Sequence, residues 1–122
     1  MTTSEIATVL AWHDALNTRD LDTLDRLCSD DIEVGDSAGA AQGHAALRNW
    51  AEALGATVEP GRMYVHDGVV VAEQTITAPD GTTSTSASAF RVVRDHVTSV
   101  FRHDTLAAAL AATDLTERDL AG

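Results

Sequence analysis

The second half of the chain alternates apolar and polar residues over four long segments, and this alternation constrains the fold more than any other feature. The segments are Thr57–His66, Val69–Ala78, Thr82–Val93 and Val97–Thr105. Two of the links between them are Asp-Gly pairs, at 67–68 and 80–81, and such pairs favour tight hairpin turns that need positive φ. The third link, Arg94-Asp95-His96, is equally short. The sequence therefore predicts three consecutive hairpins that form an antiparallel meander.

The first half has apolar residues at helical spacing instead, and it predicts three helices. The first covers residues 4–17, with Ser4 as its cap. Asp20 suits the cap of a second helix, whose apolar stripe runs from Leu21 through Cys28 and which ends at Asp30-Asp31. The third helix lies near His44–Leu54, with Gly55 at the position where glycine commonly ends a helix.

A short strand is predicted between the second and third helices. Ile32 and Val34 alternate with Glu33 and Gly35, and Asp36 closes the strand before the small-residue loop Ser37–Ala41. A carboxylate placed there by two packed helices could face a cavity. The alternative is that Asp36 caps the following turn, which aspartate does well.

These elements predict an α+β fold with three N-terminal helices packed in a strongly curved antiparallel sheet. Residues 1–122 form a single domain, in which 107–122 is a short helix or a loose tail. A curved sheet around a helix encloses a pocket at its open end. The apolar side of one strand, at Ala87, Ala89 and Val93, predicts a homodimer through the outer face of the sheet.

Charge and composition exclude several partners. The formal net charge is −11, and all eight basic residues are arginine, so no basic patch is expected to bind nucleic acid or an anionic membrane. No apolar run approaches the roughly 20 residues that span a bilayer. The start of the chain lacks a secretory signal pattern, and Cys28 is the only cysteine. We expect a cytoplasmic protein in which Cys28 is a buried structural thiol.

Two segments resemble the nuclear transport factor 2-like superfamily, ALNTRDLDTLDRLCSDD and GHAALRNWAEAL. Within that superfamily the resemblance is nearest to SnoaL-like polyketide cyclases and ketosteroid isomerase-like proteins. The resemblance covers nearly the whole chain to about Leu106 and implies a cone-shaped, cystatin-like fold. It also implies a cofactor-independent isomerase, cyclase or epoxide hydrolase. Its substrate would be a small hydrophobic molecule, polyketide- or terpenoid-like in character.

The resemblance implies a role for Asp36, which falls where the isomerases keep their general base. The family holds the developing oxyanion with a tyrosine and a protonated aspartate, and those positions here are Trp12 and Ser88. An indole N–H and a serine hydroxyl are much weaker acids than a phenol. The isomerase oxyanion hole is therefore not reproduced.

The last predicted strand offers further polar groups. By the same comparison with the family, the side chains of Val100, Arg102 and Asp104 point toward the pocket, and those of Phe101 and His103 point outward. A shift of one residue in the strand register would exchange the two sets. Epoxide hydrolases of the superfamily use an Asp-Arg-Asp constellation. The catalytic candidates are the same residue types at positions that do not match, Asp36, Arg102 and Asp104. Dehydratase-like members pair histidines with an aspartate, and the histidines that could serve are His13, His66 and His103.

Six residues are candidates for the substrate-binding wall of the pocket: Trp12, His13, Trp50, Ser88, Phe90 and Val100. Several of the candidates also have a structural interpretation. Trp12 and Trp50 could be core aromatics, His13 a satisfied core histidine, and Arg102 with Asp104 an ion pair at the sheet rim. No metal-binding spacing of histidines and no phosphate-binding glycine loop occurs, so we expect no metal and no cofactor.

The alternative to an enzyme is a non-catalytic ligand-binding or dimerisation module. A closed cone filled by side chains, with Asp36 exposed at its rim, would favour that alternative.

Overall fold

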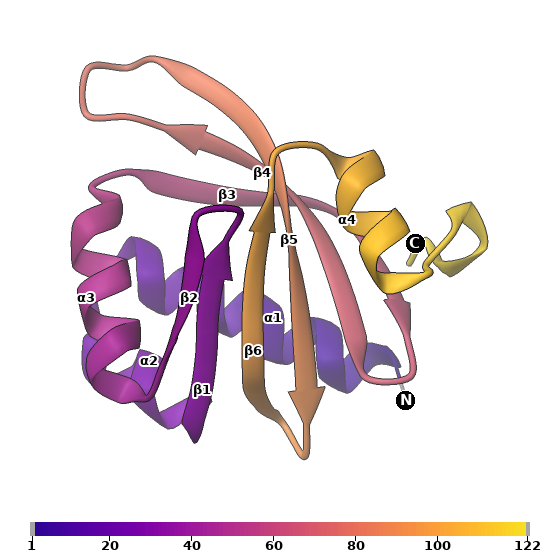
Figure 1. Ribbon diagram of the computed structural model, residues 1–122, viewed down its shortest axis with the longest axis horizontal. Coiled ribbons are helices and arrows are strands. Elements are labelled where there is room, and N and C mark those ends of the chain that lie inside the picture. The colour runs from indigo at the N-terminus through magenta and orange to yellow at the C-terminus, as the bar shows by residue number, and fades with distance from the viewer. Residues whose placement is uncertain (1, 122) are drawn as a thin grey trace.

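The computed structural model describes residues 2–121, and it contains one curved, unclosed sheet with helices on both faces (Figure 1). The strand order is β2-β1-β6-β5-β4-β3. The strands are β1 (Cys28–Asp36), β2 (Gly39–Gln42), β3 (Thr57–His66), β4 (Val69–Thr77), β5 (Thr83–Val93) and β6 (His96–His103). The helices are α1 (Thr2–Asn17), α2 (Leu21–Arg26), α3 (His44–Leu54), α4 (Leu106–Thr113) and a 3-10 turn, η1 (Glu117–Asp119). The α+β architecture predicted from the sequence is confirmed.

The meander from β3 to β6 agrees with the alternation in the sequence, but its two Asp-Gly links differ in backbone conformation. Asp67 and Gly68 both have positive φ, at 49° and 79°. In the second Asp-Gly pair only Gly81 does, at 88°. That link is a longer loop, in which the Ala78 amide donates to the Thr82 carbonyl at 2.9 Å. Asp80 therefore caps a loop, with Oδ1 accepting from the Thr82 amide at 2.9 Å, and does not form a two-residue turn.

The second helix is shorter than predicted. It ends at Arg26, and Cys28 already belongs to β1, so the prediction that the helix continues through Leu27 and Cys28 is wrong. The Leu27 carbonyl accepts from the Val97 amide at 2.8 Å, and Cys28 pairs with Val97. Pairing with β6 thus takes over from helical hydrogen bonding at this point. Ser4 is also not a cap, because α1 already includes it; its hydroxyl instead donates to Asp95.

The loop predicted at Ser37–Ala41 is wrong in its second half, where β2 begins at Gly39. β2 pairs antiparallel with the end of β1, from Glu33↔Gln42 to Asp36↔Gly39. Glycine and alanine have low strand propensity, so only the pairing partner makes this segment a strand. β1 in turn lies parallel to β6, the one parallel pair among the described strands.

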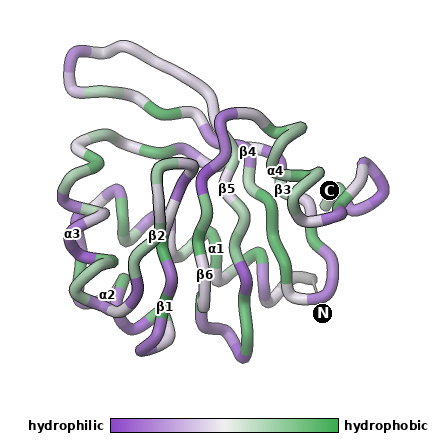
Figure 2. Tube along the Cα trace, in the orientation of Figure 1, coloured by the Kyte–Doolittle hydropathy of each residue, from purple (hydrophilic) through white to green (hydrophobic). Residues whose placement is uncertain are grey.

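Two apolar cores lie on opposite faces of the sheet. The larger core fills the concave face, against α1 and α3, with Trp12, Leu16, Ile32 and Phe90 among its members. The smaller one lies beneath α4 and contains Tyr64, Val71, Ala87, Ala109 and Leu115. Hydrophobic residues follow the central strands and the turns are hydrophilic (Figure 2). No helix in the described part of the chain is long and apolar enough to cross a membrane.

The outer sheet face is thus partly covered by the chain itself. Ala87, which the sequence analysis placed against a second subunit, is fully buried in the core beneath α4. Val93, at the other end of β5, is 47% exposed.

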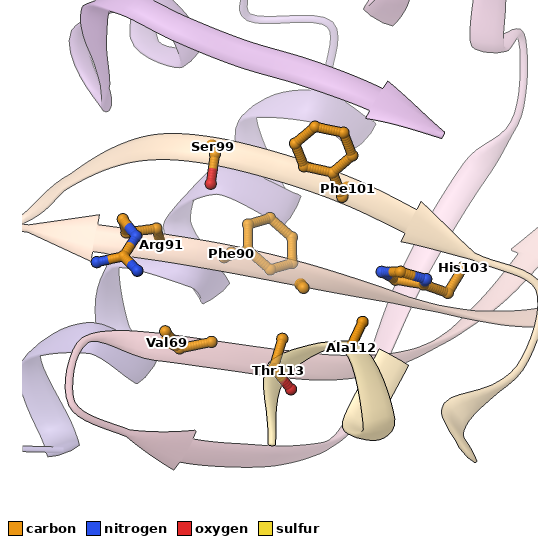
Figure 3. A pocket seen from close by; sticks show the side chains of 9 residues that line it. Val69, Phe90, Arg91, Ser99, Phe101, His103, Ala112 and Thr113 are labelled. Carbon is orange, nitrogen blue, oxygen red and sulfur yellow. The ribbon is translucent and has the colours of Figure 1, made fainter. Parts of the chain in front are cut away.

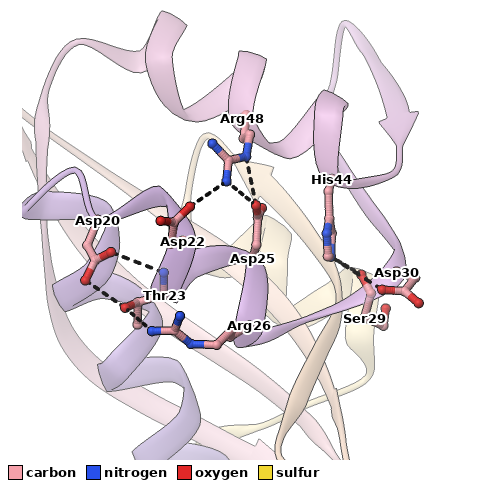
Figure 4. Close-up of polar contacts among 9 residues, drawn as sticks. All are labelled: Asp20, Asp22, Thr23, Asp25, Arg26, Ser29, Asp30, His44 and Arg48. Atoms are coloured by element: carbon pink, nitrogen blue, oxygen red, sulfur yellow. Dashed lines mark hydrogen bonds and ion pairs between the residues drawn. The ribbon is translucent and has the colours of Figure 1, made fainter.

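An ion-pair cluster joins α2 to α3 (Figure 4). Arg48 Nε donates to Asp25 Oδ2 at 2.7 Å, and Nη2 donates to Asp22 Oδ1 at 3.0 Å. The hydrogen bond that Arg48 donates to Asp25, followed by the one it donates to Asp22, raises the pKa of Arg48. This cluster positions α3, which carries Trp50.

Candidate functional site

The interior of the cone is filled by aromatic side chains. Trp12 of α1 and Phe90 of β5 are each 1% exposed, and their rings meet edge to face with centroids 5.0 Å apart. Trp50 of α3 is partly buried, and its centroid lies 5.8 Å from that of Trp12. Val100 is 1% exposed in the same core. The interior positions predicted to bind substrate therefore pack against one another.

His13 belongs to a buried chain of hydrogen bonds. Its Nδ1 donates to the Val9 carbonyl at 2.8 Å, so Nε2 accepts from the Gln74 amide nitrogen at 2.9 Å. Gln74 Oε1 in turn accepts from the Ser88 hydroxyl at 2.8 Å. Burial lowers the pKa of His13, against a smaller opposing effect of the Val9 hydrogen bond. The neutral ring is fully paired, as in a satisfied core histidine.

Gln74, which links His13 to Ser88, is a buried polar residue that the sequence analysis did not identify. The available signal was its place on the inward side of β4, two residues from the fully buried Ala72. Burial also raises the pKa of the Cys28 thiol to about 12, which agrees with the predicted structural role of that residue.

Asp36 lies at the end of β1, exposed to solvent. It follows Ile32 and Val34 on the same side of the strand, since side chains alternate. Its Oδ1 accepts from the Ala38 amide at 2.8 Å, which is the turn contact given as the alternative role. The residue thus caps the β1–β2 turn at the rim of the cone.

The side chains of β6 alternate between the two faces of the sheet as predicted. Val100 is buried in the inner core, whereas Ser99, Phe101 and His103 line a hollow on the outer face. Arg102 pairs with Ser88 in the ladder, and its guanidinium lies over the Trp50 ring, 5.8 Å from the centroid. Asp104 is exposed just beyond the end of β6. Arg102 and Asp104 form no ion pair within 4.0 Å in the described structure.

A hollow of ≈ 540 Å³ lies between α3 and the β1–β2 hairpin. Among the described residues, Asp36 is the only charged one that lines it, and Asn49 and Trp50 line it from α3. The rest of the lining is small and apolar: Val34, Gly35, Ala38, Gly39, Ala40, Ala41 and Ala46. The structure thus brings Asp36 and Trp50 to one hollow, with Arg102 stacked on Trp50.

The remaining candidates do not join this hollow. His13 is buried in the core, and His103 lies on the outer face. His66 is exposed, with its Nε2 3.2 Å from Asp67 Oδ2. Within residues 2–121, no three His, Cys, Asp or Glu side chains are grouped so that they could hold a metal ion.

The SnoaL-like domain matches residues 9–105 of this chain, which is most of its length. The chain belongs to the SnoaL-like domain family. No curated protein sequence matches it.

Solved structures share the fold of this SnoaL-like domain at low sequence identity. A putative polyketide cyclase from Sinorhizobium meliloti has a TM-score of 0.73 at 20% identity, covering 80% of this chain and 94% of that one. A putative ketosteroid isomerase from Kribbella flavida has a TM-score of 0.75 at 16% identity, covering 83% and 77%. An LEH-like epoxide hydrolase from M. tuberculosis has a TM-score of 0.73 at 20% identity, covering 93% and 94%. At such identities the likeness extends to the fold alone.

Proposed function

We propose that this SnoaL-like domain binds a small, flat, hydrophobic molecule in the hollow between α3 and the β1–β2 hairpin. The observation that carries the proposal is this mainly apolar hollow of ≈ 540 Å³, with one partly exposed indole and one carboxylate at its edge. Ligand sites of this kind have volumes of roughly 300–1,000 Å³ and few polar groups. Trp50 would supply a flat contact surface, and the Arg102 guanidinium behind it would hold the indole in place.

Binding without catalysis is the form of this function that the geometry favours. Asp36 is exposed and engaged with the Ala38 amide, so its carboxylate stays hydrated. Trp12 and Ser88, at the family's oxyanion-binding positions, are 1% and 2% exposed and do not line the hollow. A molecule in the hollow therefore has a carboxylate nearby but no buried donor for a developing oxyanion.

Catalysis with Asp36 as general base is the second candidate. It is supported by the position of Asp36 on the hollow and by structural neighbours described as a cyclase, an isomerase and an epoxide hydrolase. The substrate would then carry an acidic C–H beside a carbonyl, or an epoxide ring.

Two alanines on α3 provide a matched test of binding, with the neutral dye Nile red as the probe. Ala46 lines the hollow, whereas Ala53 is exposed on the same helix and does not. Ala46→Phe should fill the hollow and weaken dye binding about tenfold or more, because it removes the volume that the dye occupies. Ala53→Phe should leave the affinity within about twofold of wild type. Equal affinities for the two variants would contradict the proposed site.

Asp36→Asn separates the two candidates. A non-catalytic domain should turn over neither a β,γ-unsaturated ketone nor styrene oxide, and Asp36→Asn should change Nile red affinity by less than about threefold. If the wild type converts either compound and Asp36→Asn loses about 10²–10⁴-fold of that rate, Asp36 is a general base and the catalytic candidate holds.

A further inference from the structure

A second hollow lies on the opposite face of the sheet, between α4 and strands β4 to β6 (Figure 3). Its volume is ≈ 390 Å³. The lining residues are Val69, Ala89, Phe90, Arg91, Ser99, Phe101, His103, Ala112 and Thr113. α4 follows residue 105, where the SnoaL-like match ends, so one wall of this hollow comes from residues beyond the matched range.

The charge of this hollow is opposite to that of the protein. The chain has 19 acidic residues and 8 arginines, yet within residues 2–121 the only ionisable side chains that line the hollow are Arg91 and His103. Neither of them forms an ion pair within the described residues. Figure 3 places them at opposite ends of the hollow. In a protein with a net charge of −11, Arg91 is thus, within the described part of the chain, a positive charge without a carboxylate partner, with which a small anion can pair.

The polar and apolar groups are arranged in order along two strands. Arg91 lies directly across from Ser99, and Ala89 lies across from Phe101. Phe101 extends over the neighbouring strand, where a side chain at Gly35 would come within 2.8 Å of its Cε1. A charged end beside Arg91 and Ser99 thus adjoins an aromatic surface with small side chains opposite it.

We propose that this hollow binds a small aromatic carboxylate. The carboxylate would accept hydrogen bonds from the Arg91 guanidinium and the Ser99 hydroxyl, and the ring would lie on Phe101 against Ala112 of α4. This site is separate from the hollow at Asp36, so the two proposals can fail independently.

A second copy of the chain fits this hollow less well. Packing about a two-fold axis through it would bring the Arg91 side chains of the two copies close together, and like charges oppose such an interface. A small anion instead pairs with Arg91.

The test uses 2-naphthoate as the probe and 2-naphthamide as its uncharged counterpart, with affinity measured by calorimetry. The naphthoate should bind at least about fivefold more tightly than the amide, because only the anion pairs with Arg91. Arg91→Gln should lose about the same factor. Arg26→Gln, which removes an exposed arginine from α2 and changes the net charge equally, should stay within about twofold of wild type.

The position of the ligand is tested on α4. Ala112 lines the hollow and Ala111 does not, although both are exposed. Ala112→Phe should abolish naphthoate binding and Ala111→Phe should not, while Nile red binding is unchanged in both. Equal binding of naphthoate and naphthamide, equal effects of the two arginine variants, or binding retained in Ala112→Phe would each overturn the proposal. So would a dimer that Ala112→Phe dissociates, because the hollow would then be an interface between copies.

Discussion

At the scale of single residues, three buried polar side chains on the inner side of the sheet satisfy one another. His13, Gln74 and Ser88 come from different elements and form one continuous chain of hydrogen bonds. Each would be costly to bury alone, because an unpaired polar group loses its water without replacement. The sequence suggested His13 and Ser88 for a substrate-binding wall, and in the structure both belong, with Gln74, to a hydrogen-bond network.

His13 should make the fold sensitive to acid. Burial lowers its pKa in the folded state below the ordinary value of 6.5. As the pH falls through about 6.5, His13 binds a proton in the unfolded chain but not in the folded chain, so the free energy of unfolding decreases. The contribution of this one group is at most about 1.4 kcal/mol per pH unit. Urea unfolding between pH 7.5 and 5 should show this slope.

Substitutions of two histidines isolate that effect. His13→Gln removes the buried titrating group and should flatten the pH dependence, whatever its effect on stability at neutral pH. His96→Gln alters an exposed histidine beside the β5–β6 turn and should keep the wild-type slope. A His13→Gln profile parallel to that of wild type would show that His13 does not set the acid sensitivity.

At the scale of elements, the β3–β4 turn and the β4–β5 loop each contain a glycine in the left-handed region. Gly68 and Gly81 both have positive φ, at 79° and 88°, where a side chain is strained. They differ in their surroundings. A Cβ at Gly68 would lie 3.0 Å from the Val92 carbonyl oxygen, whereas a Cβ at Gly81 would meet nothing within 4 Å. The β3–β4 turn therefore packs against β5, and the β4–β5 loop projects into solvent.

This difference predicts unequal costs for the same substitution. Gly81→Ala should lower the free energy of unfolding by about 1 kcal/mol, from the left-handed backbone alone. Gly68→Ala should lower it by about 2 kcal/mol or more, because the added methyl group also presses on Val92. Chemical denaturation of the two variants measures the contrast. Equal decreases in the free energy of unfolding would mean that the Val92 carbonyl moves away from the added methyl group without destabilising the fold.

At the scale of the whole molecule, the homodimer stays a prediction, and the structure narrows where it would form. α4 covers the Ala87 end of the outer face, and Val93 at the other end is 47% exposed. Leu10 on α1 has the same exposure, 47%, at a site away from this face. The cytoplasmic location also stays a prediction.

Sedimentation velocity should therefore detect a dimer whose contact includes Val93. Val93→Asp should raise its dissociation constant about tenfold or more, because a charge would be buried in the contact. Leu10→Asp, which adds the same charge elsewhere, should have little effect. A monomer in the wild type, or equal effects of the two variants, would contradict the prediction.

Alternation and turn residues in the sequence were sufficient to predict β3 to β6, and the spacing of apolar residues with Gly55 at the end predicted α3. These signals act within a few residues, so the local chain carries them. Asp36 was also placed correctly at the end of its strand, with turn capping as one of its two predicted roles. The family resemblance then defined the fold.

Long-range contacts decided the rest. Cys28 belongs to a strand because Val97, distant in sequence, pairs with it. The run Gly39–Gln42 becomes β2 because it pairs with the end of β1, which β6 holds in place. Trp12 and Phe90 fill the cone because each is complementary in shape to the other, and burial of this kind depends on neighbours that no local pattern specifies. The hollow under α4 likewise exists only where that helix meets β5 and β6. The sequence by itself determined the elements and the family, and tertiary packing determined which surfaces remained open to a ligand.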